Sequence, residues 1–184
     1  MLWEADALAA MNVRLSLARE LKIHSMETVR SSAFSMAAHA EDNVVVVGGP
    51  DMNHTWKTYA NRLALPYEFR LVGDYYRIVA REGGESFGGA ARDPEAGVKQ
   101  DSALVVFARN PFEPSSRLIM MAGCGGLATL AAAAVFSPEY ARKITRRFDT
   151  SKPLALILSV EDVNGYVAKP KIVAWKHFTQ PTGD

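Results

Sequence analysis

The sequence contains few of the residues that make disulfides or metal sites. Cys124 is the only cysteine among 184 residues, so no disulfide can close within the chain. The four histidines are scattered and show no metal-ligand spacing with the cysteine, so neither a metal nor another cofactor is expected. The N-terminus lacks a basic stretch followed by an apolar one, which is the pattern of a secretory signal. These absences predict a protein of the reducing cytoplasm.

An excess of charge of one sign is also missing. The chain has 21 lysines and arginines against 20 aspartates and glutamates, a formal net charge of +1. Without a basic field, neither nucleic acid nor an anionic membrane is expected as a partner. Apolar residues make up 48% of the chain and charged residues 22%, which is typical of a soluble globular protein. A chain of this length predicts one core that buries about two-thirds of the unfolded surface.

Long uncharged runs are limited to residues 118–136, which is about the length that spans a bilayer. Gly123, Gly125 and Gly126 lie within this run and would break a membrane helix near its middle. The same glycines suit a turn between a strand and a helix. The run therefore predicts a buried strand, a turn and a buried alanine-rich helix.

The first forty residues predict an N-terminal helical segment. Apolar residues recur at helical spacing over residues 3–22, and a second, weaker helix is predicted over residues 25–40 with Ser25 as its N-cap. We expect the first helix to cover a sheet or a partner. Residues 41–184 are then predicted to form an α/β domain as one structural unit.

That domain begins with an uninterrupted run of valines at residues 44–47 that leads into Gly48. Such a run predicts a strand covered on both faces, in a central and parallel position. A helix is predicted over residues 53–63, and a hairpin over residues 67–80 because Gly73-Asp74 separates two extended runs. Residues 81–100 are rich in glycine and predict a long exposed loop that could act as a lid.

The second half of the domain predicts strands at residues 102–108 and from Leu118. The connection between them, Arg109 to Ser116, has eight residues and is too short for a crossover helix, so the two strands are expected to be antiparallel if they pair. Ser137-Pro138-Glu139 predicts the start of another helix. Final strands are predicted at residues 154–160 and 171–175, with a turn at Asn164-Gly165 between them. The predicted fold is a three-layer Rossmann-like α/β domain with a mixed, mainly parallel central sheet and N-terminal helices.

Two glycine-rich turns each follow a predicted strand and precede a predicted helix. Clustered glycines let backbone N–H groups approach a ligand closely, and a helix N-terminus favours an anion. In such sheets ligands bind beyond the carboxyl ends of the strands, so the two turns would share one crevice if their strands are neighbours. The predicted ligand-binding residues are Gly48, Gly49, Pro50, Asn53, Thr55, Arg109, Asn110, Gly123, Gly125, Gly126 and Thr129.

The Gly-Gly-Pro-x-x-Asn pattern at residues 48–53, combined with the later glycine turn that reaches Thr129, resembles Rossmann-like nucleotide-binding families. These families include the lysine-decarboxylase-like phosphoribohydrolases, the nucleoside deoxyribosyltransferases and related ligand-sensing domains of bacterial signalling and defence systems. The resemblance implies a nucleotide-like ligand across the strand ends. The phosphoribohydrolases place a glutamate after a Gly-Gly-x-Gly-Thr motif, whereas this chain has only apolar residues from Leu130 to Phe136.

The resemblance without that glutamate implies ligand binding without turnover. We therefore expect a sensor or regulatory domain for a nucleotide-like molecule or another anionic metabolite. Its expected partners are further copies of the chain in a homo-oligomer, or an effector protein. A structural or oligomerisation module is an alternative, in which the N-terminal helices and the alanine-rich helix near Ala131–Ala134 pack against other copies.

A second alternative is a cysteine-dependent hydrolase or amidotransferase. Ala122-Gly123-Cys124-Gly125-Gly126 is similar to the Gly-x-Cys-x-Gly elbow of class I glutamine amidotransferases and differs at its first residue. A helix N-terminus would lower the pKa of the Cys124 thiol. No histidine stands in the His-x-Glu pattern of that family, and a lone cysteine beside glycines also suits a small buried filler. The candidate bases are His24, His39, His54 and His177, and the candidate orienting acids are Glu161 and Asp162.

Overall fold

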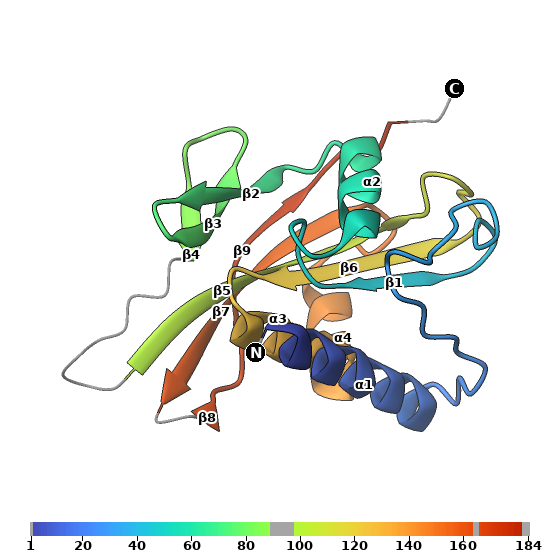
Figure 1. The fold of residues 1–184 in the computed structure, drawn as a ribbon, viewed down its shortest axis with the longest axis horizontal. Helices are drawn as coiled ribbons and strands as arrows, with labels where there is room; N and C mark the ends of the chain where they lie inside the picture. The colour runs from blue at the N-terminus through green and yellow to red at the C-terminus, as the bar shows by residue number, and fades with distance from the viewer. Residues whose placement is uncertain (1, 89–97, 164–165, 182–184) are drawn as a thin grey trace.

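The computed structural model describes residues 2–88, 98–163 and 166–181, which form a central β-sheet with helices on both sides (Figure 1). The helices are α1 (Leu2–Glu20), α2 (His54–Leu63), α3 (Gly126–Ala132), the 3-10 helix η1 (Ala133–Phe136) and α4 (Pro138–Arg147). The strands are β1 (Val44–Val47), β2 (Tyr67–Val72), β3 (Tyr75–Ala80), β4 (Ser86–Gly88), β5 (Val98–Arg109), β6 (Arg117–Gly123), β7 (Leu154–Val163), β8 (Tyr166–Val167) and β9 (Lys171–His177). No helix in the described part of the chain is long and apolar enough to cross a membrane.

The central sheet has the strand order β1-β6-β5-β7-β8, and β9 also pairs with β7. Only β1 and β6 are parallel among the described strand pairs of this sheet, and the others are antiparallel. The prediction of a mixed sheet in an α/β fold is confirmed, but the predictions of a mainly parallel sheet and a central β1 are wrong. The valines of β1 pack into apolar clusters on both faces of the sheet. The layers on either side of the sheet therefore bury this edge strand although it has only one neighbouring strand.

The two faces of the sheet carry separate apolar clusters. On one face α1, α3, η1 and α4 pack against inward residues such as Val105 and Leu156. On the other face α2 and the small antiparallel sheet β2-β3-β4 pack against residues such as Val106 and Met120. Figure 1 shows α1, α3 and α4 together on one side of the sheet, with α2 and the small sheet on the other. Alternate residues of one strand therefore stabilise opposite layers.

Several elements form where the sequence predicts them. α1 and α2 are helices, and Asn53 caps α2. β2 and β3 form the predicted hairpin, with Val72 paired to Tyr75 across Gly73-Asp74. The uncharged run becomes β6 followed by α3 and η1, and β5 and β6 pair antiparallel. Ser137 caps α4 by accepting a hydrogen bond from the Tyr140 backbone N–H.

The predicted helix over residues 25–40 is wrong. This segment is mostly exposed, without regular structure over residues 25–30 and with turns over residues 31–33 and 36–40. In the second turn region Ser35 Oγ accepts a hydrogen bond from the Ala38 backbone N–H. Serine side chains compete with helical hydrogen bonding in this way, which favours turns over a helix. The segment is held by Phe34 and Met36, which pack against the core cluster on the α2 side. Within the described part of the first forty residues, the structure therefore has one helix, α1, and residues 25–40 do not form a second.

The predicted loop over residues 81–100 is shorter than expected, because β4 and the start of β5 occupy parts of it. Residues 89–97, in the middle of that loop, lie outside the described residues, as does the predicted turn at Asn164-Gly165.

Candidate functional site

The two glycine turns lie side by side because β1 and β6 are parallel neighbours. Val47 is paired with Met121, and the Gly48 backbone N–H donates to the Met121 carbonyl at 3.0 Å. Both strands end at the same edge of the sheet, where α2 and α3 begin after their turns. The sequence left this adjacency open, and the structure brings the turns together.

In the first turn, the polar side chain of Asn53 stabilises the fold through two hydrogen bonds. Gly48 has a φ of 99°, a conformation that favours glycine. Asn53 Oδ1 accepts from the Trp56 backbone N–H at 3.2 Å, and its Nδ2 donates to the Val47 carbonyl at 2.9 Å. The amide therefore caps α2 and ties that helix to β1. Thr55, another predicted ligand residue, is buried in the first turn of α2.

The second turn is packed tightly against its own helix. The Gly123 backbone N–H donates to Thr129 Oγ1 at 2.9 Å, and a Cβ at Gly123 would lie 2.5 Å from the Thr129 backbone nitrogen. The Cys124 backbone N–H donates to the Ser102 carbonyl at 2.8 Å. Gly123 and Thr129 therefore serve the close approach of α3 to β6.

Two carboxylates lie directly beside these glycines. A Cβ at Gly48 would lie 2.7 Å from Asp6 Oδ2, and a Cβ at Gly125 would lie 2.7 Å from Asp101 Oδ2. Burial raises the pKa of the Asp6 carboxyl, and a hydrogen bond with Thr129 opposes this rise. Asp101 is buried, and its Oδ1 accepts from the Ser102 backbone N–H at 2.7 Å. A phosphate at this corner would meet negative charge whenever these carboxyls are ionised.

Pro50 borders a small cavity of about 220 Å³ between α2 and β2. Tyr67 lines it, and its hydroxyl is buried without a hydrogen-bond partner among the described residues. Burial, followed by the nearby charge of Glu85, raises the pKa of Tyr67 to about 12. The hydroxyl is thus a neutral donor and acceptor on a residue that shares this cavity with Pro50.

Cys124 is half-buried beside the second glycine turn, and its Sγ lies so close to Gly88 of β4 that a Cβ there would clash with it. Two candidate bases lie at the opposite end of the sheet. His39 contacts Asp42 just before β1, and His177 contacts the Pro153 carbonyl just before β7. His54 begins α2 on the same side as Cys124 but is exposed, and His24 lies beyond the end of α1. Among the candidate acids, Glu161 pairs with Lys171, and the Asp162 side chain lies outside the description.

Across the described residues, no three histidine, cysteine, aspartate or glutamate side chains gather in a way that could hold a metal ion.

Arg109 and Asn110 lie at the end of the sheet opposite the glycine turns. β5 runs antiparallel to β6, so Arg109 pairs with Arg117 while Ala103 pairs with Gly123. Asn110 is fully buried, and its amide donates to the Ala40 carbonyl and accepts from the Phe112 backbone N–H. These two predicted ligand residues therefore cannot share a site with the glycine turns.

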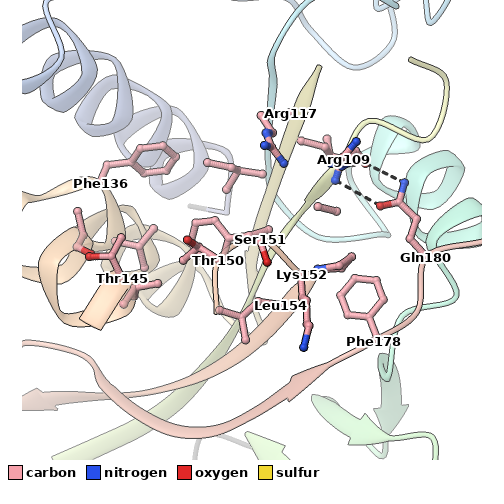
Figure 2. Close-up of a pocket in the computed structure, with 18 of the residues that line it drawn as sticks. Arg109, Arg117, Phe136, Thr145, Thr150, Ser151, Lys152, Leu154, Phe178 and Gln180 are labelled. Carbon is pink, nitrogen blue, oxygen red and sulfur yellow. Dashed lines mark hydrogen bonds between the residues drawn. The ribbon is translucent and has the colours of Figure 1, made fainter. Parts of the chain in front are cut away.

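A groove of about 980 Å³ lies at this opposite end (Figure 2). It is formed by the last residues of α1, by η1 and α4, by the ends of β5 and β6, and by residues 178–181. Its apolar wall includes Leu17, Leu21, Phe107, Ile119, Val135, Phe136, Ile144, Leu154 and Phe178. Its charged residues are Arg109, Arg117, Arg142, Lys152 and Glu20, so positive charge predominates.

The arginines at this groove are arranged unusually. Arg109 and Arg117 are direct cross-strand partners, and such partners point to the same side of a sheet. Like charges directly opposite each other are destabilising. Neither guanidinium forms an ion pair with any described carboxylate. Among the described residues, the Gln180 side chain bonds only to the Arg109 backbone (Figure 2). Its amide donates at 3.0 Å and accepts at 3.3 Å, which leaves the Arg109 guanidinium available for a ligand.

Sequence reasoning selected Arg109 but missed Arg117 and the groove. A usable signal was present, because Arg109 and Arg117 stand at the two ends of the short connection between strands predicted to be antiparallel. The apolar wall comes from segments distant in the sequence and gave no comparable signal. Comparison of the chain with protein-family models, with curated proteins and with solved structures finds no match.

Proposed function

We propose that this protein binds a small amphiphilic anion in the groove, without turning it over, and acts as a sensor or regulatory domain. The observation that carries the proposal is the cross-strand pair Arg109 and Arg117 at the edge of a large apolar groove. An anionic group between the two guanidinium groups would offset their repulsion and accept bidentate hydrogen bonds.

The shape and lining of the groove support a ligand with an apolar body. Its volume of about 980 Å³ is in the range of small-molecule sites. Phe136, Leu154 and Phe178 supply apolar wall, and Thr145 and Thr150 add hydroxyl groups that could orient a polar substituent. A carboxylate, phosphate or sulfonate attached to an apolar chain or ring system is the class of molecule that matches both parts.

Binding without turnover is favoured by the residue types in the groove. The described residues that line it include no histidine and no cysteine, which are the commonest bases and nucleophiles of hydrolases. The hydroxyl of Thr145 donates to carbonyls of its own helix, those of Ala141 and Arg142 in α4.

The test compares the binding of dodecanoate and dodecanol to the full chain by calorimetry. We expect dodecanoate to bind more tightly than the neutral alcohol, and its affinity to fall as ionic strength rises. Arg117→Ala and Arg109→Ala should each weaken dodecanoate binding by roughly 10- to 100-fold, because a hydrogen bond to a charged group contributes about 1.5–3 kcal/mol. Arg146→Ala removes an exposed arginine of α4 that does not line the groove, and should leave the affinity unchanged.

Equal binding of the acid and the alcohol, or loss of affinity in all three variants alike, would refute the role of the arginine pair.

We also propose a second candidate site for a nucleotide-like ligand at the glycine turns. Two strand-turn-helix units side by side are the part of the chain that resembles Rossmann-like domains. Pro50 and Tyr67 line one cavity, and the Tyr67 hydroxyl, which has no hydrogen-bond partner among the described residues, supports a polar ligand there. Asp6 and Asp101 suit hydroxyl or amino groups of a nucleoside better than its phosphate. Comparing the affinities of adenosine and AMP distinguishes recognition of the nucleoside from recognition of its phosphate. Adenosine should bind more tightly than AMP if these carboxylates face the ligand.

A further inference from the structure

The outer face of α1 is apolar although the helix is already docked through its inner face. Leu8, Met11 and Leu15 are exposed by 48%, 58% and 55%. On the inner face Ala9 and Val13 are buried in the core cluster that contains the alanines of α3. Residues spaced three and four apart lie on one face of a helix, so the three exposed residues form one continuous stripe. A helix that is apolar on both faces is typically covered on both.

The stripe ends in charges of opposite sign. Glu4 lies four residues before Leu8, and Arg19 lies four residues after Leu15, and both are exposed. The acid is in the first turn of α1 and the base is in its last turn. The sequence along this face is therefore acidic, apolar, apolar, apolar and basic, from the N-terminal to the C-terminal end.

This pattern is complementary to itself when reversed. In an antiparallel pair of α1 helices centred between Met11 and Asn12, Glu4 of one chain faces Arg19 of the other and Leu8 faces Leu15. A parallel pair would instead place Glu4 against Glu4 and Arg19 against Arg19, which repel each other. A two-fold symmetric interface uses the same patch on both subunits, and this stripe meets that requirement.

We propose that a second copy of this chain covers the outer face of α1, through antiparallel packing of the two α1 helices. Figure 1 shows α1 along the lower edge of the molecule, and the three stripe residues on it are exposed. One helix face is smaller than the roughly 800 Å² per partner of a standard stable interface. The dimer is therefore weak and depends on protein concentration.

The charges at the two ends of the stripe give the sharpest test, by sedimentation velocity of the full chain over a concentration series. The unaltered chain should show a monomer–dimer equilibrium. Glu4→Arg and Arg19→Glu should each shift it toward monomer, because both end pairs become repulsive. A mixture of the two variants should recover the dimer, since one variant then carries a base at both ends of the stripe and the other an acid at both ends. Each end pair of the mixed dimer is attractive again.

A second pair of variants tests the apolar part of the stripe. Leu15→Asp should give a monomer, whereas Leu71→Asp, which places the same change on an equally exposed leucine of β2, should dimerise like the unaltered chain. A chain that is monomeric at every concentration would overturn the proposal and leave the stripe to a different protein. A dimer that survives Leu15→Asp, or two charge variants that fail to recover it on mixing, would overturn it equally.

Discussion

At the scale of single residues, Asp6 gives a pH dependence with a definite sign. Burial raises the pKa of its carboxyl in the folded chain, and the hydrogen bond with Thr129 only partly opposes this. The folded state thus holds the proton more tightly than the unfolded chain, so the contribution of Asp6 to stability is present at low pH. It is lost as pH rises from the unfolded pKa through the folded one.

Asp6→Asn should therefore raise the melting temperature at neutral pH and remove this part of the pH dependence. The asparagine amide oxygen can still accept a hydrogen bond from Thr129. Melting curves between acidic and neutral pH measure the effect, and Asp51→Asn, at an exposed position after the same glycine turn, is the matched control. An Asp6→Asn variant with the same pH profile as the unaltered chain would show that the carboxyl does not carry the dependence.

The first glycine turn shows how far a prediction from single residues reaches. The glycines after the valine run predict a close backbone approach, and the structure has one, with Gly48 at a φ of 99°. The group that approaches Gly48 in the structure is the Asp6 carboxylate of α1, about forty residues earlier in the chain. A glycine in the sequence indicates that another group comes close to the backbone, but it does not identify that group. For this reason the sequence did not predict the carboxylates beside the turns.

At the scale of elements, the N-cap of α2 predicts how substitutions of Asn53 change the free energy of unfolding. Asn53 both caps α2 and bonds to the Val47 carbonyl of β1. Asn53→Ala should lower the free energy of unfolding by about 1–2 kcal/mol, as the loss of a helix cap typically does. Asn53→Asp should retain most of the cap but lose the bond from Nδ2. Denaturant unfolding gives both values, and Asn61→Ala on the exposed face of α2 should cost much less.

The elements that sequence reasoning identified correctly are those specified by local signals. α2 and α4 have capping residues at their starts, and the β2–β3 hairpin has Gly73-Asp74 at its turn. The order of strands depends on contacts between distant segments, which residues 44–47 alone do not encode. Their valines demand burial on two faces, and an edge strand between two layers satisfies this as well as a central strand does.

At the scale of the whole molecule, α1 connects three features. Its first turns contact the two glycine turns through Ala5 and Asp6. Leu17 in its last turn, and Leu21 just after its end, line the groove. Its outer stripe carries the proposed dimer contact. The inner face of α1 determines the position of the helix relative to all three features. This face packs closely because Ala9, a small residue, is fully buried on the side of the sheet that α3 covers.

A larger side chain at Ala9 should therefore disturb distant parts of the molecule together. Ala9→Leu should lower the free energy of unfolding by roughly 1–3 kcal/mol, the usual cost of overpacking a filled core. By shifting α1 away from α3 it should also weaken dodecanoate binding in the groove, although Ala9 itself does not line it. Ala7→Leu, on the exposed side of α1, should change neither quantity. An Ala9→Leu chain that is destabilised but binds dodecanoate normally would show that the position of α1 does not control the groove.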